Sequence, residues 1–402
     1  MIREFSISVY LILFKLIFSF FKLFPLKNKV TFVVSFGDNA KYVLDELKKG
    51  NSTSDIVCLY TKPSVKSIFE GYSDIGLIPF ESKDILKTIL SIYHLATSKY
   101  IIIDNYYGFL AATEFKPGVE CVQLWHAAGA VKKFALEDQS NASRSQRANE
   151  RFLKVYRKFD KVVVGSDAMA AVFMKAFGIP SKNILRTGIP RTDFFFDKNK
   201  KKQVIEKLES DNPDLKSKKV LLYAPTYRDG ELEASDIKLD LARMQKELGD
   251  DYIVLLRLHP AIRKTFSYND KFPGFVYDYS GPDYDVNELL LVTDILISDY
   301  SSIPYEFALL NKPMIFYAYD LEEYTKSRGL WENYSSMVPG PMVKETADII
   351  KVIKKNQFDL DLVRDFSKKW NKYSNGNSSL NLVNYISSPA EENLQKRETA
   401  VQ

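Results

Sequence analysis

The sequence has few of the residue types that bind soft metals or form disulfides. It contains only three histidines and two cysteines among 402 residues. A zinc site is therefore not expected. Cys58 and Cys121 lie in separate apolar runs, which argues against a disulfide framework and favours reduced thiols in a cytosolic protein.

Two nucleotide-binding signatures are also absent. No Gly-x-Gly-x-x-Gly segment follows a predicted strand, and no Gly-x-x-x-x-Gly-Lys-Ser/Thr segment occurs. Dinucleotide redox chemistry and P-loop chemistry therefore lack support. The formal net charge is only +5, so the overall charge does not predict nucleic acid as a partner.

Apolar and aromatic residues, in contrast, are plentiful. Hydrophobic residues make up 46% of the chain, and 27 phenylalanines and 24 tyrosines bring the aromatic share to 13%. This content suits a large core or contact with a membrane interface. Because 402 residues exceed what one hydrophobic core usually serves, two domains are expected.

Strand and helix patterns alternate from residue 30 onward. The predicted strands are 30–35, 55–60, 100–104, 120–125 and 161–165 in the first half, and 220–224, 252–258, 275–277, 295–298 and 314–318 in the second. They are rich in Val, Ile and Leu without alternation, as in strands buried on both faces of a parallel sheet. Helical segments such as 40–49, 84–98 and 145–159 lie between them. The predicted fold class is α/β, with two doubly wound domains.

The expected domain boundaries follow changes in composition. Residues 1–29 form a membrane-associating segment, 30–186 an N-terminal Rossmann-like domain, 187–386 a C-terminal Rossmann-like domain and 387–402 a disordered polar tail. The division between the two domains is placed near the charged stretches 197–202 and 211–219.

The first residues of the chain are predicted to contact a membrane. Residues 7–24 are almost wholly apolar, and ~18 helical residues at ~1.5 Å each nearly match a ~30 Å hydrocarbon core. A polar stripe nevertheless recurs on one helix face, formed by Glu4, Ser8, Lys15, Ser19 and Lys22. This pattern favours a helix lying in the interface over a spanning helix, with a buried packing helix as the alternative. No small-residue cleavage site follows, and Lys27 and Lys29 favour a cytoplasmic location for the remainder.

A second segment combines charge with helical spacing. A basic stripe recurs at three- and four-residue intervals, formed by Arg144, Arg147, Arg151, Lys154 and Lys158. A neighbouring apolar stripe is formed by Ala148, Phe152, Val155 and Phe159. The pattern fits a solvated face on a core-packed helix, or attraction to anionic lipids worth ~1 kcal/mol per cation.

Two of the three histidines lie where a predicted strand ends. They are His126, in Gln-Leu-Trp-His-Ala-Ala-Gly, and His259, in Leu-Leu-Arg-Leu-His-Pro. Ligands gather at the carboxyl ends of parallel strands, and histidine suits proton transfer near neutral pH. One such residue in each half predicts a catalytic cleft between two domains. His94, inside a helical pattern, is interpreted as a packed or solvated helix residue.

Other strand ends offer groups that bind anions. The small residues after His126 let backbone N–H groups approach a ligand, and Thr226, Arg228 and Arg257 follow two further strands. Ser301 and Ser302 precede a helix, and Arg191 lies near the domain division. Each segment alone is better explained as a cap, turn or strand stop. Together they predict a site for a doubly phosphorylated substrate.

One pair of carboxylates has two interpretations. Asp283 and Asp285 form an Asp-x-Asp segment like those that hold a metal in some nucleotide-sugar enzymes. Asp285 and Glu288, however, have the spacing of a capping box before an apolar run, so a helix N-cap is the stronger interpretation.

The strand-end segments resemble a known family. Trp-His126, Thr-Gly-Ile-Pro-Arg191, Tyr-Ala-Pro-Thr226-Tyr-Arg, Arg257-Leu-His259 and Ser-Asp-Tyr-Ser301-Ser302 are similar to motifs of the CDP-glycerol glycerophosphotransferases of wall teichoic acid synthesis. The resemblance covers roughly residues 30–385. The Trp-His-Ala-Ala-Gly-Ala segment, in place of Trp-His-Gly-Thr-Pro, together with Ile-Ile-Ile-Asp104-Asn-Tyr-Tyr, resembles the primase branch.

The resemblance implies an architecture, a donor and a set of donor-site residues. It implies a GT-B arrangement of two Rossmann-like domains about a central cleft, CDP-glycerol as donor and no obligatory metal or other cofactor. The implied donor-site residues are His126, Ala127, Ala128, Gly129, Ala130, Arg191, Pro225, Thr226, Arg257, Leu258, His259, Ser301, Ser302 and Glu306. Many family members have Asp where Glu306 stands.

The hypothesis for the reaction combines both lines of reasoning. A sugar hydroxyl of an undecaprenyl-diphosphate-linked disaccharide attacks the glycerol-bearing phosphorus of CDP-glycerol and releases CMP, at the cytoplasmic face of the membrane. His126 is the expected general base, while His259, Arg257 and the serines of 301–302 neutralise charge. Three alternatives stay open: a poly(glycerol phosphate) polymerase, a GT-B nucleotide-sugar glycosyltransferase and an inert membrane-associated scaffold. The oligomeric state is not predicted.

Overall fold

The chain folds into two compact units, which are described separately. The computed structural model describes residues 2–50, 53–226, 228, 237–258 and 268–388. Unit 1 comprises Met1–Ala127, Phe134–Asp193 and Tyr373–Gln402, and unit 2 comprises Ala128–Lys133 and Phe194–Lys372, within those described ranges.

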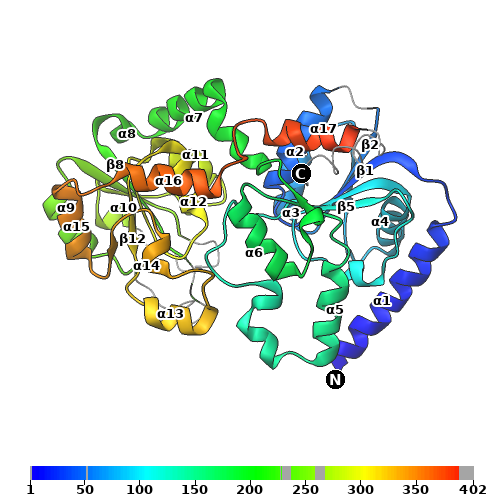
Figure 1. The fold of residues 1–402 in the computed structure, drawn as a ribbon. Coiled ribbons are helices and arrows are strands. Elements are labelled where there is room, and N and C mark those ends of the chain that lie inside the picture. Colours follow the sequence, from blue (N-terminus) through cyan, green and yellow to red (C-terminus); the bar gives the residue numbers. More distant parts are fainter. Residues whose placement is uncertain (1, 51–52, 227, 229–236, 259–267, 389–402) are drawn as a thin grey trace, which may run out of the picture. The chain divides into compact units, whose positions relative to one another are not determined.

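Unit 1 is built on a parallel sheet (Figure 1). Its strands are β1 (Lys27–Val34), β2 (Asp55–Tyr60), β3 (Gly76–Pro79), β4 (Ser98–Ile103), β5 (Glu120–Gln123), β6 (Lys161–Val163) and β7 (Ile184–Leu185), in the order β3-β2-β1-β4-β5-β6-β7. The last six residues of β1 are all buried, as expected for a strand covered on both faces.

Helices and short 3₁₀ turns connect these strands. The helices are α1 (Ile2–Phe21), α2 (Asp38–Lys49), α3 (Pro63–Phe69), α4 (Ile85–Thr97), α5 (Gln146–Tyr156), α6 (Asp167–Phe177) and α17 (Ser378–Ser387), with the 3₁₀ turn η1 (Gly108–Ala112) after β4. The Ser145 and Ser166 hydroxyls cap α5 and α6 by accepting backbone N–H bonds.

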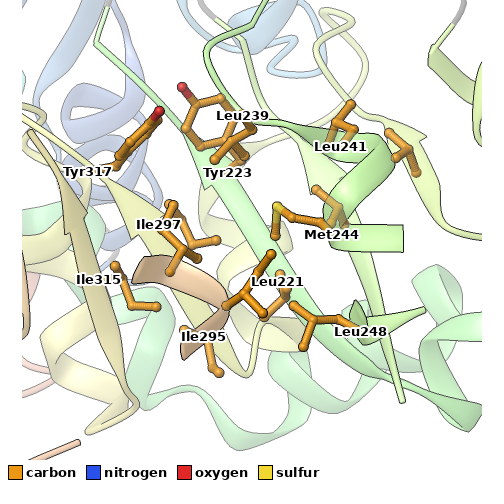
Figure 2. Packing of buried hydrophobic residues seen from close by; sticks show 14 of the residues in the cluster. Leu221, Tyr223, Leu239, Leu241, Met244, Leu248, Ile295, Ile297, Ile315 and Tyr317 are labelled. Atoms are coloured by element: carbon orange, nitrogen blue, oxygen red, sulfur yellow. The ribbon is translucent and has the colours of Figure 1, made fainter. Parts of the chain in front are cut away.

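Unit 2 repeats the architecture. Its strands are β8 (Lys219–Ala224), β9 (Tyr252–Leu256), β10 (Val276–Asp278), β11 (Ile295–Ser298), β12 (Met314–Tyr317) and β13 (Met342–Val343), in the order β10-β9-β8-β11-β12-β13. Its helices are α7 (Lys198–Asp211), α8 (Asp214–Ser217), α9 (Leu241–Leu248), α10 (Tyr268–Lys271), α11 (Val286–Val292), α12 (Ile303–Phe307), α13 (Leu321–Arg328), α14 (Tyr334–Met337), α15 (Thr346–Lys354) and α16 (Leu360–Trp370). Figure 2 shows the core where α9 packs on the sheet, with Met244 beside Leu221.

The strand order fixes where each unit can bind a ligand. In both sheets the chain reverses direction across the sheet between two central strands, β1 and β4 in unit 1 and β8 and β11 in unit 2. Open α/β sheets bind ligands beyond the carboxyl ends of the strands at such a switch point. These four strand ends are therefore the places to look for a site.

The predicted fold class is confirmed in its main features. Each of the ten predicted strands is present with ends shifted by at most three residues, and β3, β7 and β13 were not predicted. These three unpredicted strands lie at sheet edges and have two to four residues, too few to produce an apolar run. Asp285 caps α11 by accepting the Asn287 N–H bond at 2.8 Å, as its spacing predicted.

The division into units differs from the predicted domain boundaries. The chain leaves unit 1 after Asp193 rather than after residue 186, and residues 373–388 return to unit 1. The Asp193 carboxylate accepts the Ser378 and Ser379 N–H bonds at 2.9 and 2.8 Å and so fastens the start of α17. The predicted tail lies outside the described residues from 389 onward.

The apolar N-terminal segment forms helix α1. Among the described residues it is the one helix long and apolar enough to cross a membrane, over Glu4–Phe21, and 11% of that window is buried. It packs against α4 and η1 through Phe14 and Phe18, which are 2% and 1% exposed. The Glu4 end of the predicted polar stripe forms an ion pair with Arg151 on α5 at 3.0 Å.

Candidate active site

His126 lies three residues beyond the end of β5, in unit 1. Its ring is stacked between Phe36 and Trp125, with centroid distances of 4.2 and 4.3 Å. Its Nδ1 lies 3.2 Å from the backbone carbonyl oxygen of Asp104. A carbonyl oxygen can only accept a hydrogen bond, so Nδ1 carries the proton and the lone pair is on Nε2. A general base that accepts a proton at Nε2 requires this tautomer.

Burial keeps this imidazole neutral. Removal from water lowers the pKa of His126 to about 4; the hydrogen bond to Asp104 opposes the shift, and the charges of Arg191 and Lys62 add to it. The ring is therefore uncharged throughout the neutral range. A neutral ring can accept a proton.

The backbone before His126 is strained. Trp125 has a φ of +59°, a left-handed conformation that costs a residue with a side chain about 1–2 kcal/mol. Its N–H donates to Gln123 Oε1 at 2.8 Å, and its carbonyl accepts from Asn39 Nδ2 at 2.9 Å. One side chain at the end of β5 and one in α2 thus hold a conformation that presents His126 beyond the sheet.

Asp104 organises the switch point of unit 1. Its buried carboxylate, at the end of β4, accepts the backbone N–H bonds of Ser35, Phe36 and Gly37, each at 2.9 Å. The Tyr107 hydroxyl also donates to it, at 2.8 Å. Asp104 therefore fixes the loop that carries Phe36, while its own carbonyl orients the His126 ring. Its place at the end of a predicted strand is the signal that could have found it.

Arg191 was predicted to bind a phosphate. In the structure it forms a hydrogen bond to the backbone of His126 instead. Its Nη1 donates to the His126 carbonyl oxygen at 2.9 Å and lies 3.6 Å from Asp38 Oδ2. Its backbone N–H donates to Asn39 Oδ1 at 3.0 Å. The structure thus brings Arg191 and His126 together in unit 1.

The switch point of unit 2 contains a second group of predicted residues. Thr226 follows β8, and its N–H donates to Asp299 Oδ1, beyond β11, at 2.7 Å. The Thr226 hydroxyl oxygen is buried and has no hydrogen-bond partner in the described part of the chain. A buried unpaired hydroxyl is costly unless a ligand satisfies it. Pro225, Ser301 and Ser302 lie at the same strand ends, with Ser302 at the start of α12.

Arg228 is part of a buried ionic network rather than an open anion site. Its Nη1 donates to Asp299 Oδ2 at 2.6 Å, and its Nε and Nη2 form a bidentate pair with Asp320 at 3.0 Å each. Its guanidinium also lies over the rings of Tyr300, Tyr319 and Tyr324. The network joins the ends of β8 and β11 to the loop after β12, and so supports the segments that hold Thr226 and Ser301.

The remaining predicted donor-site residues of unit 2 are mostly tied to neighbouring loops. Arg257 Nη1 donates to the carbonyls of Tyr279 and Gly281 at 2.9 and 2.8 Å, and the Leu258 N–H donates to Ser280 Oγ at 2.9 Å. Glu306 is 1% exposed within α12. His259 lies outside the described residues.

The segment after His126 passes from one unit to the other. Ala127 belongs to unit 1, whereas Ala128, Gly129 and Ala130 belong to unit 2 and are buried there. A Cβ at Gly129 would lie 2.1 Å from the Tyr305 ring, so packing alone explains the glycine. This differs from the expectation that small residues there admit a ligand.

We expect Gly129→Ala to destabilise the protein. Tyr305 is 1% exposed and packs against both Phe366 and Trp370, so its ring cannot move aside freely. Overpacking of this kind costs about 1–3 kcal/mol, which thermal unfolding would measure. Gly71→Ala is the control, because a Cβ there meets nothing within 4 Å. Equal melting temperatures for the two variants would contradict this account.

The other candidate groups have structural roles. His94 Nδ1 lies 3.2 Å from Lys29 Nζ, and burial lowers the pKa of His94 to about 4. Cys58 and Cys121 are buried free thiols. Within the described ranges, no three or more His, Cys, Asp or Glu side chains are grouped so that they could hold a metal.

Comparison with known proteins places this geometry in context. The chain is 37% identical to the teichoic acid glycerol-phosphate primase of Bacillus subtilis (strain 168), over 96% of this chain and 98% of the primase. It is 34% identical to the teichoic acid poly(ribitol-phosphate) polymerase of Bacillus spizizenii, over 94% of this chain and 60% of the polymerase.

The fold is also that of a solved relative. A variant of the wall teichoic acid polymerase TagF soaked with CDPG matches with a TM-score of 0.77 at 21% identity, over 100% of both chains. This likeness supports the predicted GT-B-like architecture. Residues 16–388 match the CDP-Glycerol:Poly(glycerophosphate) glycerophosphotransferase family. The chain therefore belongs to this family of glycerophosphotransferases.

Proposed function

We propose that this protein is a teichoic acid glycerol-phosphate primase. It transfers one glycerol phosphate from CDP-glycerol to a disaccharide linked to undecaprenyl diphosphate and releases CMP. The observation that supports this chemistry best is the His126 ring, whose Nδ1 is committed to the Asp104 carbonyl and whose Nε2 is left as a proton acceptor at a strand end. The nearly complete match to a primase favours priming over polymerisation.

The reaction is a direct displacement at phosphorus. The acceptor hydroxyl oxygen forms a bond to the glycerol-bearing phosphorus of CDP-glycerol, and the bond from that phosphorus to the bridging oxygen breaks. CMP leaves with the bridging oxygen and its electron pair. The proton of the attacking hydroxyl passes to Nε2 of His126. Such reactions depend mainly on positioning and electrostatic stabilisation.

The donor's diphosphate is assigned to the switch point of unit 2. The buried Thr226 hydroxyl, which has no hydrogen-bond partner of good geometry among the described residues, and the half-buried Ser301 and Ser302 are polar groups at one strand edge, where α/β sheets bind ligands. His259 and Arg257 would supply further positive charge. No metal is required by this proposal.

A membrane-facing surface is the second part of the proposal. Of the large hydrophobic side chains that are exposed in the described residues, 11 of 19 lie on α1 and the residues after it or on α4. They include Leu16, Leu23, Ile85 and Leu86, at 63%, 80%, 73% and 77% exposure. A contiguous apolar surface of this kind indicates an interaction site. We infer that α1 and α4 together lie in the cytoplasmic membrane interface.

We expect Leu16→Glu and Leu86→Glu each to weaken binding to phosphatidylglycerol vesicles at least tenfold. Burying one leucine in hydrocarbon contributes about 1.5–3 kcal/mol, which a carboxylate forfeits. Co-sedimentation would measure the effect. Leu362→Glu on α16, a leucine that is 52% exposed, controls for the added negative charge. Wild-type binding by Leu86→Glu, or equal weakening by Leu362→Glu, would contradict a role for α4.

Donor competition tests the reaction class. We expect CMP to be released from CDP-glycerol only when a lipid-linked disaccharide is present, and UDP-sugars to be inert. Turnover of a UDP-sugar would instead indicate a glycosyltransferase, and preference for CDP-ribitol would indicate a ribitol-phosphate transferase.

A further inference from the structure

A cavity of about 570 Å³ lies within unit 1, between helix α1, the loop after β4 and helix α5. Its volume is in the range of small-molecule sites. The residues that matter for its chemistry are Ile7, Leu11, Tyr106, Arg144, Arg151 and Phe152. None of them belongs to the His126 site or to the predicted donor site.

The cavity has an apolar wall and a cationic wall. Ile7 and Leu11 of α1 provide aliphatic surface, and Arg144 and Arg151, at the start of α5 and within it, provide two guanidinium groups. Arg151 forms a bidentate pair with Glu4, with N–O distances of 3.0 and 3.3 Å. Glu4 is the one carboxylate among the lining residues, so the charged side chains of the cavity sum to one positive charge.

The five basic residues of the predicted stripe do not share one environment in the structure. Arg144 and Arg151 are half-buried and line the cavity, whereas Arg147 and Lys154 of the same helix are exposed. Arg144 is held in place, because its guanidinium stacks 4.5 Å above the Phe152 ring and its Nη2 donates to Ser140 Oγ at 2.9 Å. A planar, positioned guanidinium of this kind suits recognition of a phosphate group.

The cavity is close to the candidate base along the chain. Asp104, whose carbonyl orients His126, is followed two residues later by Tyr106, which lines the cavity. Two residues of extended chain span at most about 7 Å. The loop after β4 therefore contributes both to the cavity lining and to the contact that orients His126. On its other side α1 exposes apolar side chains such as Leu13 and Leu16.

We infer that this cavity binds the phosphate linker of the lipid acceptor. The guanidinium groups of Arg144 and Arg151 hold the diphosphate, and the aliphatic wall of α1 contacts the first part of the hydrocarbon chain, which continues into the membrane. The sugar that the diphosphate carries then extends toward His126. This inference rests on the proposed function, because it assumes a lipid-linked acceptor.

Steady-state kinetics with two acceptors tests the inference. The first is the lipid diphosphate-linked disaccharide and the second is the same disaccharide on a neutral alkyl chain, both in neutral detergent micelles. We expect Arg144→Gln to raise the KM for the diphosphate acceptor about tenfold, the loss of one charge-assisted hydrogen bond. The KM for the neutral acceptor and the KM for CDP-glycerol should not change. Arg144→Lys should recover part of the loss.

Controls separate this role from folding and from general attraction to lipids. Arg157→Gln removes an exposed charge from the end of the same helix and should leave both acceptor KM values unchanged. An equal rise for both acceptors would indicate a structural effect, and a rise only in micelles that contain phosphatidylglycerol would indicate binding of a headgroup. Either of these two results, or an unchanged KM for the diphosphate acceptor in Arg144→Gln, would overturn the inference. The proposed function would survive them as long as the wild type transfers glycerol phosphate. Failure of the wild type to use either acceptor would overturn the proposed function as well.

Discussion

Replacing His126 with asparagine is expected to lower kcat for glycerol phosphate transfer about a thousandfold. Loss of a positioned general base typically costs a hundredfold to ten-thousandfold. Asparagine is short, but its side-chain amide can still donate to the Asp104 carbonyl that now accepts from Nδ1 of His126. It has no group that can take the proton in place of Nε2. The substitution therefore removes the base but keeps a hydrogen-bond donor for the Asp104 carbonyl oxygen.

The measurement is CMP release with saturating acceptor, accompanied by calorimetric binding of CDP-glycerol. Donor affinity should change little, because the proposed donor site is in unit 2. His94→Asn is the matched control, since His94 packs against Lys29 beyond the amino-terminal end of the same sheet. A kcat within threefold of the wild type for His126→Asn would rule out the base assignment.

The pH profile provides an independent test of the same residue. A base must be unprotonated, and burial lowers the pKa of His126 from its usual value of 6.5 to about 4. The acid limb of kcat/KM, which reports the free enzyme, should therefore lie near pH 4. Between pH 6.5 and 5 the rate should be nearly constant. A tenfold fall across that interval would show that the base titrates like an exposed histidine.

Asp299→Asn is expected to lower the free energy of unfolding by about 1.5–3 kcal/mol, the loss of a hydrogen bond between charged groups. Asp299 is 2% exposed, accepts the Thr226 N–H bond and pairs with Arg228, which is bonded to Asp320 as well. Neutralising this carboxylate removes its charge-assisted hydrogen bond to Arg228 and leaves Arg228 paired with Asp320 alone. The loops after β8 and β11 lose their common anchor, so affinity for CDP-glycerol should fall too.

Chemical denaturation and calorimetry would measure these two effects. Asp361→Asn is the matched control, because the Asp361–Arg364 pair, at 2.7 Å, is largely exposed on α16 and such pairs contribute little. Its unfolding transition should be nearly unchanged. If Asp299→Asn were equally benign, the network would not support the switch point of unit 2.

The strand pattern and the strand-end residues could be predicted from the sequence for a physical reason. Strands buried on both faces, such as β4 and β11, form apolar runs that end abruptly at polar residues, here Asp104 and Asp299. The edge strands β7 and β13 have two residues each and form no such run. The central strands were therefore predictable, whereas three of the four edge strands were not, and β10 is the edge strand that was predicted.

Roles within the site were harder to predict because they depend on contacts between distant segments. The spacing around Arg228 is that of an anion site, but Asp299 and Asp320, 71 and 92 residues away, bind its guanidinium. The strained φ of Trp125 has no sequence signature either, because glycine would be the usual residue there. The basic stripe on α5 had a regular spacing that did not reveal which cations face α1.

The mass of the lipid product tests the central claim most directly. Purified protein would be incubated with a defined undecaprenyl-diphosphate-linked disaccharide and a large excess of CDP-glycerol, and the glycolipid analysed by mass spectrometry. The account predicts one added glycerol phosphate per acceptor and one CMP released for each, with no further growth at long times. A ladder of products that lengthens with time, or an acceptor that gains a sugar instead, would contradict it.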